Sequence, residues 1–506
     1  MQFAELARVS TAVAETSARS AKVELLAACL RTLRTAEVPV AVTFLTGSVA
    51  RTRVGWASLR ELPAAAAEPT LELLEVAASL DRLGAAAGPG SQRARKQELD
   101  ELFGRATEPE QHLLRALLHG GLRQGALEGV MVEAVAKAAG VPPADVRRAT
   151  MLAGGLDEVA HAALAEGSAG LAGFGLELFR PVQPMLAQTA VGVTEALGRV
   201  EAAVVEWKLD GARVQVHRRG DEVRAYTRSL AEVTERVPEV VEAVLGLPLE
   251  SVVLDGEVIA LREDGRPYPF QVTMSRFGST LERDRSSELP LSPFFFDCIH
   301  LDGRDLLDLP LAERLAVLDE RLPSRLRPPR CETDVADEAE RFFEEALARG
   351  HEGVMVKARS STYEAGRRGV GWLKVKRVRT LELVVLAVEW GSGRRRGKLS
   401  NIHLGARDTE SGGFVMLGKT FKGMTDEMLA WQTERFLELE TRREGHVVHV
   451  RPELVVEIAF DGVQASSRYP GGLALRFARV KGYRPDKVPS EADTIDLVRA
   501  IHAGDA

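Results

Sequence analysis

The stretch Glu206-Trp207-Lys208-Leu209-Asp210-Gly211-Ala212-Arg213 puts a lysine at the end of an apolar-flanked strand, just before a turn at a glycine. A lysine amine attacks only when it is unprotonated, and at neutral pH this requires that burial or nearby cations such as Arg213 depress its pKa. We therefore predict that Lys208 is a nucleophile with a depressed pKa. The alternative is a surface lysine paired with Glu206 or Asp210, and the rest of the chain must decide between the two.

Composition restricts the class of protein without identifying it. The chain has 506 residues, of which 45% are apolar and 27% charged, and this balance is typical of a globular protein with several domains. The formal net charge of −7 predicts no broad attraction to nucleic acid. Any such binding must therefore use local basic patches.

Cysteine usage and hydropathy indicate the compartment. Cys29, Cys298 and Cys331 are dispersed without CxxC spacing, which argues against a structural zinc site or a disulfide framework and fits a reducing compartment. No apolar run approaches the roughly 18 residues that span a bilayer, and the first residues lack a signal-peptide pattern. We therefore expect a cytoplasmic protein with no membrane partner.

Residues 1–178 are predicted to form an all-α domain. They are rich in Ala, Leu, Glu and Arg, and their apolar residues recur at helical spacing, as in the run from Leu113 to Leu118. The stretch from Thr107 to Glu110 predicts a helix N-terminus with proline in the first turn. The glycine-rich stretch from Gly120 to Gly125 contains Arg123, and it either approaches a phosphate closely or forms an interhelical turn.

Residues 179–380 are predicted to form an α+β domain. Pro181 and Pro184 end the helical pattern, and the period then changes to that of strands. The stretch from Pro293 to Asp297 predicts a buried strand that ends in an acid. The predicted strands lie at 204–208, 213–217, 252–257 and 293–297, and the predicted helices at about 231–245, 311–320 and 335–349.

Residues 381–506 are predicted to form a small β-barrel with one helix. The predicted strands are 383–388, 414–417, 447–450 and 455–460, and the helix lies at about 425–440. The stretch from Trp390 to Lys398 predicts a mobile basic loop, because glycine cannot anchor it and its cations repel one another. It is either a solvated hairpin tip or a phosphate contact, and the neighbouring core favours a phosphate contact through Arg394, Arg395 and Arg396.

Five separated segments carry charged residues at predicted strand ends or turns. Lys374 and Lys376 lie two apart on a strand, so they point to one face, where they suit a polyphosphate and disfavour protonation of a neighbouring Lys208. Glu257 and Glu352 suit Mg²⁺, which keeps several waters and bridges to phosphate oxygens. Each pair could be a structural salt bridge, but finding them all in one chain favours a nucleotide site. The segments are 208–213, 255–257, 296–297, 352–357 and 372–376.

In this order and spacing, the segments resemble the covalent nucleotidyltransferase motifs of ATP-dependent DNA ligases of the archaeal and bacterial type. The resemblance covers nearly the whole chain. It implies a multidomain fold with a helical DNA-binding domain, a nucleotidyltransferase (adenylation) core and a C-terminal OB-fold, divided as above. It implies that Lys208 becomes adenylated, that Glu206 lies at the adenine and that Phe296 stacks on it.

The same resemblance implies roles for the remaining charged residues. Arg228, in Thr227-Arg228-Ser229, matches an arginine that holds the 5′-phosphate of a nick. The run from Arg476 to Val480 resembles the last motif of the family, although Ala478 stands where a proline is common and Arg377 to Arg379 replace a more usual ending after the lysine pair. The other nucleotide and metal residues it implies are Arg213, Glu257, Glu352, Arg368, Lys374 and Lys376, and the residues that orient pyrophosphate are Arg484, Asp486 and Lys487.

We therefore predict an ATP-dependent DNA ligase that seals nicks in duplex DNA through lysyl-AMP and DNA-adenylate intermediates. The predicted cofactors are ATP and Mg²⁺, with Mn²⁺ as a substitute. We expect a nucleoid-associated monomer whose further partners are a sliding clamp or repair proteins. The alternatives are an RNA ligase or mRNA-capping-type nucleotidyltransferase, which the long helical domain disfavours, and a non-catalytic DNA-binding scaffold. An NAD-dependent ligase would need a cysteine-rich zinc module, which three cysteines cannot build.

Overall fold

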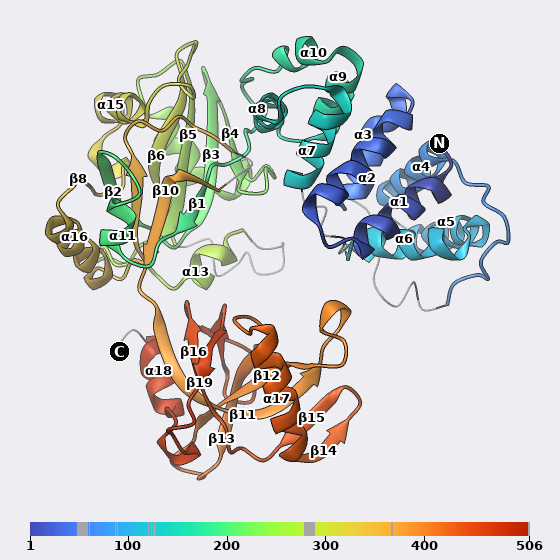
Figure 1. Cartoon of the computed structure of the whole chain (residues 1–506). Coiled ribbons are helices and arrows are strands. Elements are labelled where there is room, and N and C mark those ends of the chain that lie inside the picture. Colours follow the sequence, from blue (N-terminus) through green and yellow to red (C-terminus); the bar gives the residue numbers. More distant parts are fainter. Residues whose placement is uncertain are drawn as a thin grey trace. The chain divides into compact units, whose positions relative to one another are not determined.

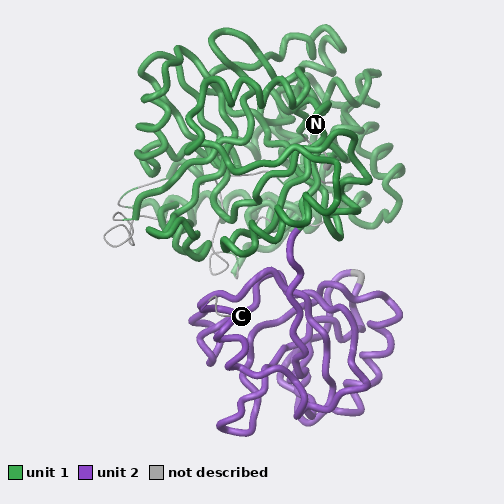
Figure 2. Tube along the Cα trace, turned by 90° about the vertical axis from the view of Figure 1, so that its left-hand side faces the viewer, with its two compact units in different colours: residues 1–375 green, residues 376–506 purple. Residues whose placement is uncertain are grey.

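The chain folds into two compact units, residues 1–375 and 376–506 (Figure 2). The computed structural model describes residues 1–47, 59, 61–86, 88, 90–119, 121, 122, 124, 128–277, 289–365 and 368–503, without the side chains of Arg368 and Arg394. Within these residues, no helix combines the length and apolar character that a bilayer-spanning segment needs.

The N-terminal part of the first unit is helical, as predicted (Figure 1). Its apolar cluster is built from residues 3–171 alone, because each helix turns an apolar stripe inward. Thr107 N–H donates to Glu110 Oε2 at 2.8 Å, which confirms the predicted helix start. The helices are α1 (Phe3–Glu15), α2 (Arg19–Thr32), α3 (Val38–Thr46), α4 (Leu73–Ala85), α5 (Ser91–Arg105), α6 (Glu108–His119), α7 (Glu128–Ala139), α8 (Pro143–Ala153), α9 (Asp157–Glu166) and α10 (Ser168–Ala172).

Gln124 joins three of these helices. Ser10 Oγ on α1 donates to Gln124 Oε1 at 2.6 Å, Lys22 on α2 donates to the Gln124 carbonyl, and Gln124 Nε2 donates to the carbonyl of Leu45 on α3. These bonds tie Gln124 to the helical region. The predicted DNA contact Arg123 lies outside the described residues.

The rest of the first unit is an α+β core with two five-stranded sheets (Figure 1). The first sheet has the order β1 (Leu186–Thr189), β10 (Arg368–Lys376), β9 (Gly353–Ala358), β2 (Ala203–Lys208) and β8 (Arg330–Glu332). The second, antiparallel sheet has the order β4 (Glu222–Thr227), β3 (Ala212–Arg219), β5 (Ser251–Ala260), β6 (Leu291–Leu301) and β7 (Arg304–Asp305). The helices are α11 (Val193–Leu197), α12 (Pro238–Leu245), α13 (Phe270–Ser275), α15 (Leu311–Arg321) and α16 (Ala336–Ala348).

Helices cover one face of each sheet, so the charged residues gather on the other faces. On β2, Val205 joins an apolar cluster with α11 and α16, which leaves Glu206 and Lys208 on the opposite side. On β3, Val214 and Val216 pack with α12 and α15, which leaves Arg213 on the opposite side. Alternation along each strand therefore places Glu206, Lys208 and Arg213 on the faces that the helices leave uncovered.

Two predicted boundaries in the core are wrong. The helix expected from about 231 begins at Pro238, because proline fits the first helical turn and the preceding residues pair or form a 3₁₀ turn. The strand expected to end at Asp297 continues to Leu301. Asp297 lies in mid-strand and accepts hydrogen bonds from Arg314 Nε at 2.7 Å and Nη2 at 3.0 Å, so it is a buried structural ion pair.

The second unit is rich in β-structure. In its seven-stranded antiparallel sheet, β11 (Arg379–Trp390) pairs along one side with both β16 (Val455–Phe460) and β15 (Val447–Val450). Thr425 caps α17 (Asp426–Glu438) by accepting from Met428 N–H at 3.1 Å. The remaining elements are β12 (Leu399–Arg407), β13 (Phe414–Thr420), β14 (Glu440–Glu444), β17 (Gly462–Ala465), β18 (Leu473–Arg476), β19 (Arg479–Tyr483) and α18 (Ile495–Ala503).

Candidate active site

Lys208 lies at the C-terminal end of β2, where the chain turns through Gly211 into β3. A side chain at position 211 could not fit, because its Cβ would lie 2.3 Å from the carbonyl oxygen of Val258 on β5. This close approach lets the Gly211 N–H donate to Glu257 Oε1 at 3.2 Å. Glycine therefore brings the lysine turn against the strand that carries Glu257.

Lys208 is surrounded by carboxylates. Its Nζ forms an ion pair with Glu352, and both side chains are about four-fifths buried. Burial alone lowers the pKa of Lys208, but Glu352, Glu257 and Asp210 together outweigh it and raise that pKa above its ordinary value. The predicted depressed pKa is therefore wrong. Cations such as Arg213 lie near Lys208 in the sequence, but the fold turns acids toward its amine.

Glu257 is the second carboxylate of the site. Burial raises its pKa to about 7, although Lys208 and Arg213 act in the opposite direction. Glu257 and Glu352 both act on the Lys208 ammonium and are oxygen donors of the kind that Mg²⁺ accepts, so this donor set fits the predicted metal. Within the described residues, no cluster of three or more His, Cys, Asp or Glu side chains could hold a metal ion. Glu257 and Glu352 are therefore the two carboxylates here that would hold such an ion.

Arg213 is held by an acid that the sequence argument did not use. Its Nε and Nη2 donate to the two carboxylate oxygens of Asp255 at 2.9 and 2.5 Å, and its Nη1 donates to the carbonyl of Met185 at 2.6 Å. The guanidinium carbon lies 5.5 Å from the ring centroid of Phe296 and 5.8 Å from that of Trp372. Arg213 is thus neutralised and fixed beside two aromatic rings.

Glu206 and Lys357 form a buried ion pair next to the rings of Phe296 and Trp372. Their side chains are 3% and 1% exposed. Lys357 Nζ lies 4.7 Å from the ring centroid of Phe296 and 4.4 Å from that of Trp372, within cation–π range. Sequence analysis gave Lys357 no role. Met355 pairs with Glu206 across the two strands, so its side chain lies on the site face. Lys357 is two residues further along the same strand, and this spacing was the signal that could have placed it on that face too.

The lysine pair lies on the strand expected for it. Leu373 and Val375 are buried in the cluster against α11 and α16, so Lys374 and Lys376 share the opposite face, as predicted. Lys376 begins the second unit and forms an ion pair with Asp461 at 3.8 Å. The backbone of Arg368 begins β10, but its side chain lies outside the described residues.

Arg228 lies apart from the Lys208 cluster in sequence and is exposed in the turn after β4. Leu230 N–H donates to the Thr227 carbonyl at 2.9 Å and closes this turn. Thr227 Oγ1 and Ser229 Oγ lie 3.0 Å apart on either side of the arginine. The turn therefore presents Arg228 to solvent.

In the second unit, Glu382 engages the residues predicted to orient pyrophosphate. Arg484 Nη1 and Lys487 Nζ each form an ion pair with Glu382, and Arg484 Nη2 contacts Asp486 Oδ2 at 2.6 Å. The hydrogen bond from Arg484 lowers the pKa of Asp486 to about 2. No local pattern marks Glu382 as a partner of these residues, because it lies about 100 positions away on β11.

The basic loop is more regular than predicted. Gly393–Arg395 forms a 3₁₀ turn, and Gly391 N–H donates to the Lys398 carbonyl at 2.8 Å. Arg395 Nη1 donates to the Phe421 carbonyl at 2.6 Å, so the loop is anchored to the end of β13. The Arg394 side chain lies outside the described residues, Arg395 is partly exposed, and Arg396 is exposed.

Two exposed aromatic rings accompany this loop. Phe421 and Phe477 are 54% and 59% exposed, and each has a cation over its ring, Arg395 at 5.8 Å and Lys422 at 5.4 Å. The Val480 N–H donates to the Lys422 carbonyl at 2.9 Å and joins the two segments. We call these four residues, Arg395, Phe421, Lys422 and Phe477, the basic aromatic patch.

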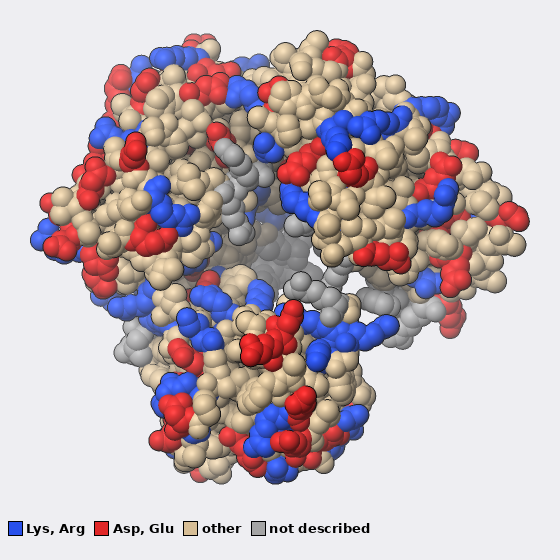
Figure 3. Space-filling view, viewed as in Figure 1, with Lys and Arg blue, Asp and Glu red and all other residues tan. Residues whose placement is uncertain are grey.

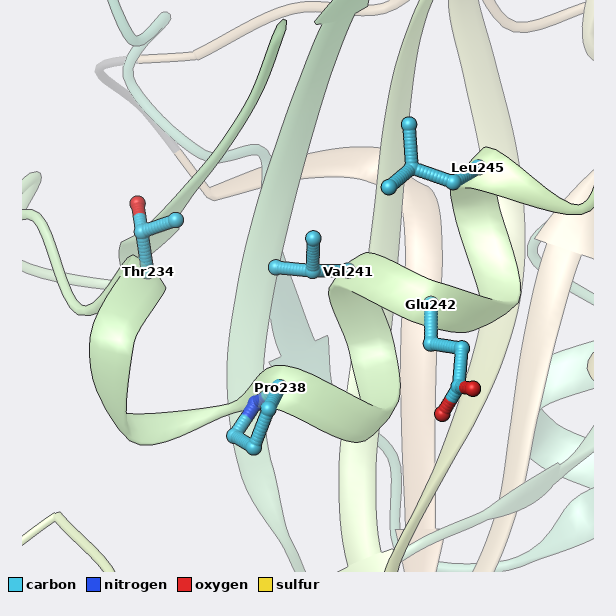
Figure 4. Close-up of a pocket in the computed structure, with 5 residues that line it drawn as sticks. All are labelled: Thr234, Pro238, Val241, Glu242 and Leu245. Carbon is cyan, nitrogen blue, oxygen red and sulfur yellow. The ribbon is translucent and has the colours of Figure 1, made fainter. Parts of the chain in front are cut away.

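Other surface features lie away from the lysine. Figure 3 shows basic and acidic side chains interspersed in the view shown, in keeping with the net charge of −7. Figure 4 shows a shallow pocket of about 410 Å³ on α12, where Val241 and Leu245 lie one turn apart. Its lining residues, Thr234, Pro238, Val241, Glu242 and Leu245, include no predicted site residue.

Comparisons with known proteins match all three parts of the chain. Residues 54–136 match the family model described as DNA ligase N terminus, residues 184–376 that described as ATP dependent DNA ligase domain, and residues 395–487 that described as ATP dependent DNA ligase C terminal region. A protein of Anaeromyxobacter sp. (strain K), named "Probable DNA ligase", is 60% identical over 100% of both chains. One of the same name from Mycolicibacterium gilvum (strain PYR-GCK) is 59% identical over 99% of both.

A solved structure named "Pmar-Lig_Pre." resembles the fold with a TM-score of 0.65 and 18% identity, over 95% of this chain and 99% of that one.

Proposed function

Because this chain belongs to the family of ATP-dependent DNA ligases, we propose that Lys208 is the residue that becomes adenylated. The observation that carries the proposal is the position of its amine, at the end of β2 between Glu352 and Glu257 and on the same strand face as Glu206. Phe296 provides the aromatic surface on which the adenine lies. The reaction seals nicks in duplex DNA.

The first step transfers AMP to the lysine. Lys208 Nζ must lose a proton before it attacks, and the Glu352 carboxylate in contact with it is placed to accept that proton. The amine lone pair then forms a bond to the α-phosphorus of ATP, and the bond to pyrophosphate breaks. Lys374 and Lys376 bind the phosphates on the opposite side from their buried strand neighbours. Mg²⁺ or Mn²⁺, held by Glu257 and Glu352, would supply charge stabilisation at these phosphates.

The next two steps join the DNA. The AMP passes from Lys208 to the 5′-phosphate of a nick, which gives that phosphate a good leaving group. The 3′-hydroxyl then attacks the same phosphorus and AMP departs. Arg228, presented by its exposed turn, binds the 5′-phosphate, and Arg213 and Arg368 contact the nucleotide.

DNA binding uses local basic groups. The helical region, including Arg123, holds the duplex through its phosphates, which makes binding tolerant of sequence and sensitive to salt. In the second unit, the basic aromatic patch with Arg394 and Arg396 provides a further contact, since exposed rings beside cations suit the sugars and phosphates of a nick. We treat residues 1–178, 179–380 and 381–506 as three domains, the last an OB-fold.

The second unit also serves the first step. Arg484, Asp486 and Lys487 orient pyrophosphate, and this requires Arg484 and Lys487 to leave Glu382. A monomer at the nucleoid that meets a sliding clamp or repair proteins completes the proposal. None of these partners is needed for the chemistry.

The test is covalent labelling with ATP that carries ³²P at the α-phosphate, followed by denaturing electrophoresis. We expect a labelled chain with ATP but not with GTP or NAD, and no label with Lys208→Ala. Lys208→Ala should still seal a pre-adenylated nick, because that step needs no nucleophilic lysine. The matched control is Lys137→Ala, which removes an exposed lysine paired with Glu24 on the helical surface.

Label from GTP would support the capping-type alternative, and a chain that binds nicks without any label would support the scaffold. Label on Lys208→Ala would show that another residue is the nucleophile.

A further inference from the structure

A buried hydrogen-bond network lies directly behind Arg213. The Asp255 carboxylate is 1% exposed and accepts from Arg213 Nε and Nη2 and from the Tyr363 hydroxyl, the last at 2.7 Å. The Tyr363 oxygen in turn accepts from the Met185 N–H at 3.3 Å, and the Met185 carbonyl accepts from Arg213 Nη1. Tyr363, Asp255, Arg213 and Met185 therefore close a ring of hydrogen bonds.

This ring leaves Arg213 with donors to spare. A guanidinium has five N–H donors, and the bonds to Asp255 and Met185 use three of them. Among the described contacts, one N–H remains on each terminal nitrogen. Their direction is set by the plane of the Asp255 carboxylate, because a bidentate pair holds both groups nearly coplanar.

Tyr363 is held in place by packing and by a backbone hydrogen bond. Its side chain is 1% exposed, its ring meets that of Trp372 edge-on at 6.3 Å, and its N–H donates to the Leu307 carbonyl at 2.8 Å. An Asp side chain can rotate about the bond that carries its carboxylate, so the tyrosine hydroxyl supplies the constraint that the arginine alone does not.

The network is also anchored to the helical region. Gln183 N–H donates to the carbonyl of Met151 at 2.9 Å, and Ala365 N–H lies 3.2 Å from the sulfur of the same methionine. Met151 belongs to the last turns of α8 and packs in one apolar cluster with Met185 and Tyr363. The two segments that hold Arg213 in place therefore meet at one helix end.

We propose that Tyr363 is a positioning residue that orients the Arg213 guanidinium toward the nucleotide, through Asp255 and the segment at Met185. The inference rests on the proposed function, in which Arg213 contacts ATP. It assigns Tyr363 no contact with ATP, and it predicts that loss of the hydroxyl alone weakens ATP binding.

The test compares two buried tyrosines in lysyl-AMP formation. Tyr363→Phe removes only the hydroxyl on Asp255, and the matched control Tyr226→Phe removes a buried hydroxyl that donates to the Phe179 carbonyl at 2.8 Å. We expect Tyr363→Phe to raise the KM for ATP about tenfold and to change kcat less than about twofold, since a small misdirection of a binding group weakens ground-state contacts. Tyr226→Phe should leave both constants near those of the wild type.

A double-mutant cycle shows whether the tyrosine acts through the arginine. Arg213→Lys removes the bidentate fork, so adding Tyr363→Phe to it should raise KM no further. Equal KM values for Tyr363→Phe and Tyr226→Phe, or effects that multiply in the cycle, would overturn the inference. Both outcomes are distinguishable from failure of the proposed function, in which the wild-type protein takes no label from ATP or Lys208→Ala still takes it.

Discussion

Replacing Lys357 by methionine isolates the energetic role of the buried ion pair at the centre of the core. The Lys357 ammonium pairs with Glu206 and lies over Phe296 and Trp372, and both charged side chains are almost fully inaccessible. Methionine has nearly the same length and an apolar end. The change therefore removes the charge while it fills most of the space.

The expected loss of stability follows from the charge that remains. Removing one partner of a buried ion pair costs about 3–5 kcal/mol, because the other charge stays in the interior without compensation. The lost cation–π contacts add to this cost, and sulfur–aromatic contacts of about 0.3–1.5 kcal/mol offset part of it. For a domain of about 200 residues, such a loss lowers the melting temperature by roughly 10 °C.

Removing both charges should restore most of this loss. In the double variant Glu206→Leu with Lys357→Met, no buried charge remains, and replacing both members of such a pair by apolar groups is often neutral or stabilising. The double variant should nevertheless take no label from ATP, because it lacks the proposed adenine contact. The double variant would then be nearly as stable as the wild type but inactive in labelling.

The assay is thermal unfolding of the full chain followed by intrinsic fluorescence at one scan rate. The surface control is Lys137→Met, which breaks an exposed pair with Glu24 and should cost less than about 1 kcal/mol. A Lys357→Met melting temperature equal to that of the control would refute the reasoning. So would a double variant that melts as low as Lys357→Met, since the cost would then come from packing and not from the stranded charge.

The remaining predictions concern pH and the separation of steps. Burial raises the pKa of Glu257 from 4.5 to about 7, so the folded chain keeps a proton that the unfolded chain loses. Its contribution to stability is therefore full below pH 4.5 and disappears as the pH rises through 7. In metal-free buffer the melting temperature should fall over this pH range, and Glu257→Gln should remove that fall. Lys487→Ala should slow lysyl-AMP formation but not the sealing of a pre-adenylated nick, whereas neutralising Arg395 and Arg396 should spare adenylation and weaken nick binding at low salt. Single-turnover assays of the two steps check this pair, and equal damage to both steps by either variant would contradict it.

Local sequence patterns predicted most of the secondary structure around the site. The alternation around Lys208 and the short apolar runs placed β2, β3 and β5 within a few residues, and the segments 447–450 and 455–460 match their strands. Such predictions succeed because side chains on a strand alternate between faces regardless of what lies against them. They fail where a distant strand sets the end of an element, as at Asp297, whose strand continues to Leu301 because it stays paired with β5 as far as Val252.

Sequence by itself determined which chemical groups the site contains: a lysine before a glycine turn, two carboxylates, a pair of lysines two apart and an aromatic residue. Only the tertiary structure decided how those groups pair. Asp255 neutralises Arg213, and Lys357 neutralises Glu206. Three acids raise the pKa of Lys208, which the sequence had predicted to be depressed. The physical reason is that Coulomb and desolvation energies depend on distance and burial, and for these residues both are set by strand register and sheet packing between segments far apart in the chain.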